Sequence, residues 1–370
     1  MLIFDRVVDT MSTNKVLREQ GRDINIPLPF PRMSRYLPGI QKGRYYIVTA
    51  NSKVGKSQIA DYIFLYNPFK FISTSKTNIK LKIFYFTMEM NKEEKVKQAI
   101  SHFLNQQDRK LIISPERMDS QFQDYILENS VLDKVKGLKE LFAKFESCVE
   151  FIDDIKNPYG IYSHIRNYAE ANGTYVTKKL EFEMVTDEGE KIKEVKDVVD
   201  YYVPNDPDEY VIILIDHASL ITPETVNGHR QTLHEAIFTL SSNYLVRMRN
   251  RWNYIPVLIQ QQAAATESVE NMKLNRLQPS ADGLGDCKLT GRDVDVMLGL
   301  FAPVRHKITE YEKYDLRVLR DRHRELSVIL NRRGGSISTQ LYFNGAINHF
   351  EELPPISSPE LVELYAKLSR

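Results

Sequence analysis

The sequence predicts an α/β fold built on a mostly parallel central sheet. Short apolar runs recur along the chain, at 45–48, 82–86, 210–215, 255–259, 296–301 and 327–330. Strands that are apolar along their whole length are typical of parallel sheets, because helices cover both faces of such a sheet. Stretches with helical spacing separate these runs, and that alternation indicates an α/β core.

Helices are expected between the strands. Apolar residues recur every three or four positions from Leu233 to Met248, which is the spacing of one helix face. We also expect helices over 58–66 and 92–104. Near the end of the chain, 340–351 predicts a closing hairpin with Asn344-Gly345 at its turn, since this dipeptide favours tight hairpin turns.

The chain divides into an N-terminal region, one large domain and a tail. A short helix followed by a linker is expected over 1–38, because the prolines between 27 and 38 oppose a helix. The large domain is expected over 39–352. The tail, 353–370, would hold a short helix that begins near Ser358.

One segment interrupts the alternation of strands and helices. Leu180 and Phe182 alternate with acidic residues, which is the pattern of a half-exposed strand. A turn is expected at Asp187-Glu188-Gly189. We therefore predict a β-hairpin insertion on the surface at about 175–207.

Composition limits the classes of function. The chain has 370 residues, 50 basic and 49 acidic, so its net charge of +1 gives no global attraction to nucleic acid, and any DNA contact must be local. Two distant cysteines, Cys148 and Cys287, predict neither a metal site nor a disulfide framework. No apolar run approaches the roughly 20 residues of a membrane span. Without a signal-peptide pattern, the expected location is the cytoplasm.

A candidate phosphate-binding loop lies between a predicted strand and a predicted helix, over Ala50, Asn51, Ser52, Lys53, Val54, Gly55, Lys56 and Ser57. This is the context of a P-loop, in which backbone N–H groups at a helix N-terminus hold phosphate. Lys56 would reach the β- and γ-phosphates of ATP, and the Ser57 hydroxyl would bind Mg²⁺. Ala50 replaces the usual first glycine, and the alternative is an ordinary glycine turn before a helix.

An acidic residue ends the most apolar predicted strand. Five apolar residues, 211–215, precede Asp216. A carboxylate at the end of a buried strand beside a P-loop is the Walker B arrangement, which holds Mg²⁺ directly or through water. The alternative is an aspartate that caps the following turn. The presence of a P-loop in the same chain favours the Mg²⁺ role.

A second acid, Glu89, follows the predicted strand 82–86. In a RecA-like sheet we expect this strand to neighbour the P-loop strand, so that its carboxyl end faces the γ-phosphate. A carboxylate there can orient and deprotonate the attacking water. The residues alone are equally consistent with an exposed glutamate that opens the next helix.

The segment Phe86-Thr87-Met88-Glu89-Met90 is similar to the Phe-Ser-Leu-Glu-Met signature of DnaB-type hexameric replicative helicases. That family also commonly has Ala at the first P-loop position. Four more stretches resemble the family in the same order, at 26–43, 230–249, 256–262 and 282–295. The resemblance covers roughly residues 26 to 352 and is closest to phage-encoded members, which would place the protein in the host cytoplasm.

The resemblance implies a RecA-like P-loop NTPase core that hydrolyses ATP with Mg²⁺. It also implies a homo-hexamer that translocates on single-stranded DNA and unwinds duplex. By resemblance, Glu89 is the catalytic base. Gln262 is the candidate γ-phosphate sensor because its distance from Pro256 matches the family, with Gln261 as the alternative among three consecutive glutamines.

The family's late strand carries a lysine and an arginine that reach the neighbouring subunit's ATP site. Arg332 matches the arginine finger, whereas Leu330 occupies the lysine position. A guanidinium supplied by another subunit makes hydrolysis depend on assembly. Arg333 is a candidate to compensate for the missing lysine. The alternative is a pair of solvated arginines on a hairpin.

Two loops qualify as DNA-binding by position, namely Thr222 to Arg230 and Glu267 to Arg292. Basic residues in such loops neutralise phosphates, and a ring would multiply them around one channel. The candidates are Arg230, Lys273, Arg276, Lys288 and Arg292. The alternative is a set of surface loops with scattered charge.

The resemblance begins at about residue 26, so we expect no counterpart of the family's N-terminal helical domain, which helps to recruit primase. We expect a primase or a helicase loader to bind through 1–38 or the tail, and the N-terminal helix to dock on an adjacent subunit. Two other functions remain open. One is a RecA-like ATPase with a recombinase or regulatory role, and the other is a non-catalytic assembly or packaging factor.

Overall fold

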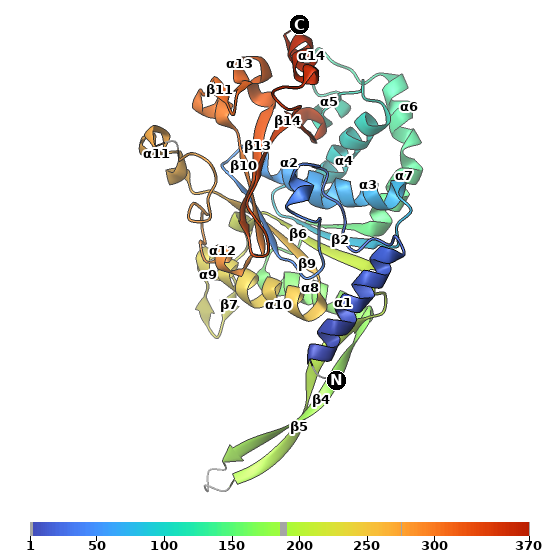
Figure 1. The fold of residues 1–370 in the computed structure, drawn as a ribbon, viewed down its shortest axis with the longest axis vertical. Coiled ribbons are helices and arrows are strands. Elements are labelled where there is room, and N and C mark those ends of the chain that lie inside the picture. The colour runs from blue at the N-terminus through green and yellow to red at the C-terminus, as the bar shows by residue number, and fades with distance from the viewer. Residues whose placement is uncertain (1–2, 186–190, 275, 370) are drawn as a thin grey trace.

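A nine-stranded sheet crosses the molecule in this computed structural model, which describes residues 3–185, 191–274 and 276–369 (Figure 1). The strand order is β15-β14-β13-β10-β1-β9-β6-β2-β3. From β10 to β3 the pairs are parallel, and from β10 to β15 they are antiparallel, so the expected mostly parallel sheet is confirmed. The strands are β1 (Tyr46–Ala50), β2 (Lys80–Thr87), β3 (Val149–Ile152), β6 (Glu209–Asp216), β9 (Ile255–Gln261), β10 (Val296–Phe301), β13 (His323–Asn331), β14 (Ser338–Asn344) and β15 (His349–Glu352).

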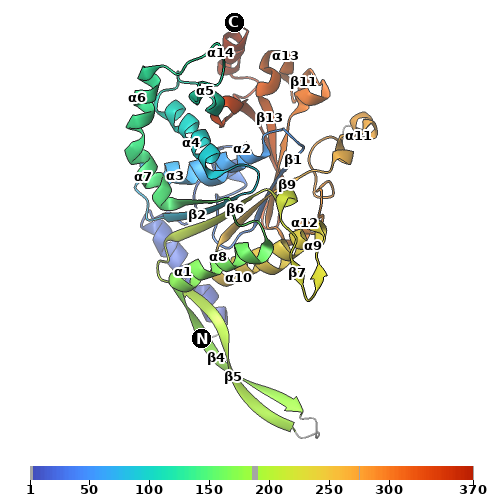
Figure 2. The same ribbon diagram turned by 180° about the vertical axis from the view of Figure 1, so that it is seen from behind.

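Helices cover both faces of the sheet (Figures 1 and 2). One layer comprises α2 (Lys56–Asp61), η2 (Tyr62–Tyr66), α3 (Asn67–Thr74), α4 (Lys92–Gln107), α5 (Pro115–Met118), α6 (Asn129–Gly137) and α7 (Lys139–Cys148). The other layer comprises α8 (Pro158–Ala171), α9 (Leu233–Phe238), η4 (Thr239–Leu245) and α10 (Val246–Trp252). The three helices expected between the strands are therefore present, and α3, α5, α6, α7 and α8 are additional.

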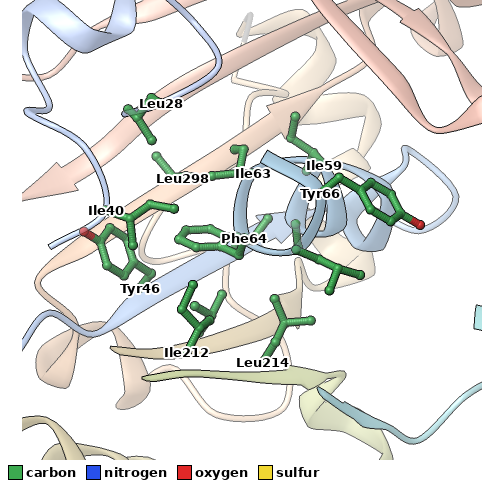
Figure 3. Close-up of a cluster of buried hydrophobic side chains, with 14 of the residues drawn as sticks. Leu28, Ile40, Tyr46, Ile59, Ile63, Phe64, Tyr66, Ile212, Leu214 and Leu298 are labelled. Carbon is green, nitrogen blue, oxygen red and sulfur yellow. The ribbon is translucent and has the colours of Figure 1, made fainter. Parts of the chain in front are cut away.

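Two apolar cores lie on the two faces of the sheet because successive strand residues point to opposite sides. On β1, Val48 faces one core and Ile47 the other. Figure 3 shows the first core around Phe64 on η2. Its ring lies 5.1 Å from that of Tyr46, centroid to centroid. Truncation of a buried phenylalanine to alanine costs about 3–5 kcal/mol, so this packing fixes the helix that follows the P-loop.

The strand neighbours differ from the expectation in one respect. We expected β2 to lie beside β1, but β9 and β6 separate them. The partner of β1 on that side is β9, with Tyr46 paired to Val257, and Val257 pairs in turn with Leu214 of β6. A strand from much later in the chain thus inserts at the centre of the sheet, a long-range pairing that local sequence patterns do not encode.

The proline-rich segment packs on the domain rather than spanning open solvent. Its prolines alternate with Ile26, Leu28 and Phe30, whose side chains are buried in the first core. Ile26 also forms a bridge to Ile40, and Arg32 pairs with Glu352 at 3.0 Å. Packed chain therefore starts at Ile26, before the Gly39 start that we expected. Ahead of it, α1 (Ile3–Glu19) has no buried residue.

The expected insertion is a long two-stranded arm that projects from one end of the molecule (Figure 1). It consists of β4 (Gly173–Val185) and β5 (Lys191–Pro204), paired antiparallel. The turn predicted at 187–189 lies outside the described residues. The tail helix, α14 (Pro359–Leu368), begins after Ser358 as predicted, and the Ser358 hydroxyl accepts from the Glu360 N–H. Arg370, the last residue of the predicted tail, is also outside the described residues.

The closing hairpin β14–β15 is confirmed, with η8 (Gly345–Ile347) at its turn. Smaller elements decorate the loops, namely η1 (Met33–Arg35), η3 (Ala218–Leu220), β7 (Thr225–Val226), β8 (His229–Arg230), η5 (Ala264–Glu267), α11 (Val269–Lys273), α12 (Thr290–Asp293), η6 (Pro303–His306), β11 (Glu310–Tyr311), β12 (Tyr314–Asp315), α13 (Leu316–Leu319) and η7 (Arg320–Arg322). Over the described ranges, each helix is too short or too polar to cross a membrane.

Candidate nucleotide-binding site

The predicted P-loop connects β1 to α2. Gly55 has a φ of 105°, a conformation that glycine adopts without steric cost. Two guanidinium groups hold the loop's carbonyls: Arg324 donates from Nε to Val54 at 2.8 Å, and Arg305 donates to Ser52. Lys56 is the first residue of α2, so the loop leads directly into a helix N-terminus, where backbone N–H groups attract phosphate.

Asp216 meets the P-loop serine. The Ser57 hydroxyl donates to Oδ1 of Asp216 at 2.9 Å. Asp216 ends β6, which does not adjoin β1, but its side chain reaches across the edge of the intervening strand. Hydroxyl and carboxylate oxygens are the ligands that Mg²⁺ prefers, with water and phosphate completing its shell. The residues present therefore fit the Mg²⁺ site implied by the resemblance, although none of the described residues form a three-residue metal cluster.

A buried ionic cluster lies behind Asp216. Lys95 Nζ lies 3.3 Å from Oδ2 of Asp216 and 3.2 Å from Oδ2 of Asp61. The hydroxyl of Tyr85 lies 2.6 Å from the same ammonium. Burial alone would raise the pKa of Asp216, but Lys95 and the Ser57 and Tyr85 hydroxyls outweigh it and hold the pKa below its usual range. For Asp61 burial prevails, which raises the pKa to about 6.

Glu89 stands at the carboxyl end of β2 and is exposed. Thr87 pairs with Asp216, so the two strand ends lie level. The Glu89 carboxylate is 54% exposed and lies 3.8 Å from Nε2 of His217. Burial and the nearby Lys56 lower the pKa of His217, which favours its neutral form. Glu89 is thus available to a water molecule at the same edge that carries Asp216.

The three consecutive glutamines at the end of β9 and directly after it have different surroundings. Gln260 is buried and donates to the carbonyls of Gly285 and Cys287 at 2.7 and 2.8 Å. Gln261 is half-buried at the end of β9. Gln262 donates from Nε2 to the Thr49 hydroxyl at 3.0 Å, and therefore contacts the strand that leads to the P-loop.

Arg332 lies at the opposite end of the sheet from the P-loop. β13 runs antiparallel to β10, so Asn331 pairs with Val296, and Val296 pairs with Tyr46 at the start of β1. The exposed Arg332 follows directly and donates to the carbonyl of Arg292. Arg333 is also exposed. Leu330, at the family's lysine position, packs against the second core.

The stretch 282–295 ends in two acidic residues, Asp293 and Asp295, that have structural partners. Oδ2 of Asp295 accepts from Arg249 at 3.0 Å and from the N–H of Tyr45 at 2.9 Å. Oδ2 of Asp293 accepts from the hydroxyls of Ser241 and Ser242 at 2.8 and 2.6 Å. These contacts tie the loop that ends at Asp295 to α10 and to the start of β1.

The candidate DNA-binding residues are all exposed, namely Arg230, Lys273, Arg276, Lys288 and Arg292. The elements that carry or flank them, β7, α9, α11 and α12, lie on the side of the molecule opposite α6 and α7 (Figures 1 and 2). Arg230 lies in β8, between β6 and the helix expected from Leu233. That helix starts at Leu233, where a capping box between Thr232 and Glu235 fixes its first turn.

The sequence reasoning missed several residues of this site. Lys95 is one of several charged residues in the first turns of α4, so its sequence surroundings do not distinguish it, whereas Asp61 is a lone acid among apolar residues of α2 and η2. Tyr85 lies in an apolar strand pattern that predicts packing alone. His217 directly follows the Walker B candidate Asp216, and Arg305 lies outside every motif.

Comparisons with solved structures bear on the fold. No protein-family model and no curated protein matches the sequence. The ATPase domain of a phage helicase aligns with a TM-score of 0.63 and 16% identity, over 94% of this chain and 99% of that domain. A DnaB-like replicative helicase, solved to show its interactions with primase, aligns with a TM-score of 0.62 and 16% identity, over 94% of this chain and 70% of that one. The expected RecA-like fold is confirmed.

A third solved structure, a KaiC-like protein from Pyrococcus horikoshii, aligns with a TM-score of 0.45 and 10% identity over 89% of this chain and 99% of that one.

Proposed function

We propose that this chain is the ATP-hydrolysing motor of a hexameric replicative DNA helicase, which translocates on single-stranded DNA and unwinds duplex. The observation that carries the proposal is the contact between Ser57 and Asp216, because it joins the P-loop to a strand-end carboxylate beside an exposed Glu89. The fold shared with helicase ATPase domains supports the choice of a DNA motor among P-loop proteins.

The roles of the residues follow from their positions. Lys56 and the P-loop N–H groups bind the phosphates of ATP. Ser57 and Asp216 would hold Mg²⁺, which would neutralise charge on the phosphate oxygens. Glu89 orients the attacking water and accepts its proton. Gln262, whose amide contacts the P-loop strand, is proposed as the sensor of the γ-phosphate.

Arg332 acts on a neighbouring copy of the chain. Its position at the far end of β13 keeps it from its own P-loop, which lies at the other end of the sheet. An exposed arginine there suits a finger that stabilises transition-state charge in the next subunit's site. A closed ring of six copies would give every site such an arginine and would gather the exposed basic loops around single-stranded DNA.

The test is the ATPase rate of wild type and Arg332→Ala, with and without single-stranded DNA, across protein concentration. Stimulation by DNA, a steep rise with concentration and loss of both in the variant are expected. An ATPase rate that changes with neither DNA, protein concentration nor the substitution would contradict the helicase proposal. It would favour a RecA-like ATPase with a regulatory or assembly role. A wild type that hydrolyses no ATP would contradict the motor itself.

A primase or a helicase loader is proposed as a partner. The supporting observation is that a DnaB-like helicase of the same fold was solved in a study of its interactions with primase.

The exposed α1 is the proposed point of contact between subunits, since its apolar residues are not buried within the chain. Deletion of residues 1–20 should therefore weaken hexamers in analytical ultracentrifugation. Unchanged hexamers would refute this contact.

A further inference from the structure

Lys95 is almost completely buried, yet no role proposed so far uses it. Its side chain is 3% exposed and that of Asp61 is 1% exposed. Lys95 comes from α4, Asp61 from α2, Tyr85 from β2 and Asp216 from β6. Four separate elements thus place one cation and two carboxylates at a single point directly behind the P-loop serine.

The ammonium of Lys95 has a complete set of acceptors. Its three protons face Oδ2 of Asp61 at 3.2 Å, the hydroxyl of Tyr85 at 2.6 Å and Oδ2 of Asp216 at 3.3 Å. The Tyr85 hydroxyl also lies 2.8 Å from Oδ1 of Asp61 and 3.0 Å from Oδ2 of Asp216. Its one proton serves one of these carboxylates at a time.

The two oxygens of Asp216 therefore have different partners. Oδ2 faces the interior and contacts Lys95 and Tyr85, whereas Oδ1 faces outward and accepts from Ser57. Because Lys95 and Tyr85 contact Oδ2, the carboxylate cannot rotate without breaking those contacts. The orientation of Oδ1 toward the P-loop is a consequence of the buried cluster.

Stability alone does not account for such a cluster. Well-packed apolar residues of similar volume commonly match or exceed a buried ion pair in stability, because desolvation offsets the Coulomb attraction. A chain with only a core to fill would lose nothing by carrying apolar residues at 61 and 95. The orientation of a neighbouring functional group is a role that apolar residues cannot fill.

We propose that Lys95 is a positioning residue that fixes the Asp216 carboxylate, with its Oδ1 directed toward the proposed Mg²⁺ position at Ser57. Lys95 also ties this carboxylate to α4, whose capping residue Asn91 lies two positions after Glu89. Asp216 and Glu89, the two acidic groups of the site, are thereby held in fixed positions relative to each other. This inference rests on the proposed function, because it assigns a role toward the metal of that same site.

The test uses a charge-balanced double variant, Lys95→Met with Asp61→Leu, which removes one buried cation and one buried anion together. The readout is the affinity for an ATP that carries a fluorescent group on its ribose, measured in excess EDTA and in Mg²⁺. Partners that orient a metal ligand typically alter metal affinity or activity about 10–100-fold. We expect the Mg²⁺-dependent gain in affinity to fall by about that factor, with affinity in EDTA unchanged.

Hydrolysis provides a second readout. In the double variant, kcat should fall and the Mg²⁺ concentration for half-maximal rate should rise, while KM for the nucleotide changes little. Lys82→Met, which removes a lysine from the same strand as Tyr85 and breaks its pair with Glu150, is the matched control and should leave the Mg²⁺ gain unchanged. A double variant with the wild-type Mg²⁺ gain and kcat would overturn the proposal.

Tyr85→Phe keeps the test decisive if the double variant does not fold. It removes one oxygen from the cluster and preserves the packing of the ring, so it should reduce the Mg²⁺ gain in the same direction. No reduction in this folded variant would also overturn the proposal. Failure of the proposed function is distinct, because wild type would then bind no fluorescent ATP in either condition.

Discussion

Ser57 and Asp216 form a hydrogen bond of 2.9 Å, although the strands that lead to them are not neighbours in the sheet. Ser57 lies in the first turn of α2 and Asp216 at the last position of β6, so each approaches the same point over the end of β9. The contact places a hydroxyl and a carboxylate where a magnesium–phosphate group would sit.

Lys56→Ala should abolish most ATP hydrolysis. Lys56 is the P-loop residue proposed to contact the β- and γ-phosphates, and the loss of one electrostatic stabiliser of a transition state commonly costs about 10²–10³ in rate. The measurement is steady-state phosphate release, with circular dichroism to confirm the fold. Lys70→Ala, a change of the same charge on the exposed side of α3, is the control. A P-loop variant as fast as this control would contradict the assignment.

Glu89→Gln should separate binding from chemistry. The substitution keeps the size of the side chain and removes its ability to accept a proton, an effect worth about 10²–10⁴ in rate for a general base. The affinity for ATP should remain close to that of wild type. Glu93→Gln, in the exposed first turn of α4, should leave the rate unchanged. Normal hydrolysis by the Glu89 variant would exclude it as the base.

A mixture of two inactive variants should regain activity. Arg332→Ala subunits retain an intact P-loop, and Lys56→Ala subunits retain Arg332, so interfaces between the two would contain one complete site. An arginine finger is worth about 10³–10⁵ in rate, which leaves a low background against which recovery is visible. The measurement is ATPase rate against mixing ratio. A mixture no faster than the average of its parts would argue against a shared site.

Acid should destabilise the fold through buried His102. Burial lowers the pKa of His102 to about 3. Nδ1 lies 3.1 Å from the carbonyl oxygen of Ile347 and donates to it, so the neutral ring is satisfied. The unfolded chain binds the proton near pH 6.5, so stability falls as the pH drops below that value and continues to fall toward pH 3.

The expected loss from this one residue is on the order of 2 kcal/mol between pH 7 and pH 5. His102→Gln cannot bind the proton and should show a correspondingly smaller dependence of urea-unfolding free energy on pH. His323, whose pKa burial lowers to about 4, should leave a residual dependence in the variant. Equal pH dependence in wild type and variant would refute the role of His102.

Removal of the Asp295 carboxylate should destabilise the chain strongly. Its partner Arg249 is largely buried, and the loss of one member of a buried pair costs about 3–5 kcal/mol because the other charge remains uncompensated. Asp295→Ala should therefore unfold at much lower urea than wild type. Asp133→Ala, which breaks an exposed pair with Lys136, should differ by less than about 1 kcal/mol. Similar effects of the two changes would contradict this view of Asp295.

The sequence predicted most strands and the P-loop, but not the way in which they meet. An apolar run and the spacing of apolar residues are local signals, so β10 and the helix after Thr232 can be predicted from their own residues. The insertion of β9 between β1 and β6 is a pairing between distant segments, and no local pattern carries it. The Lys95 cluster could not be predicted for the same reason. The sequence shows a lysine on a helix, but the burial of that lysine depends on its packing against three other elements.

The family resemblance points to residues that the local patterns do not distinguish. It singled out Glu89 and Arg332, and the structure adds that Arg332 lies far from the P-loop of its own chain. The resemblance did not indicate that Leu330 packs against the second core. Besides Arg332, Arg333 is then the exposed basic residue of that segment. The packing of Ile26, Leu28 and Phe30 was hidden by the prolines between them.

The central place of β9 also bears on synthesis of the chain at the ribosome. Both neighbours of β1 are translated long after it, because β1 begins at Tyr46, β9 at Ile255 and β10 at Val296. The P-loop strand must therefore emerge long before either partner exists, and closure of such distant pairs slows folding. The arm of β4 and β5 lengthens that interval. The nascent N-terminal half exposes apolar strand edges meanwhile, a state prone to aggregation that chaperones commonly protect.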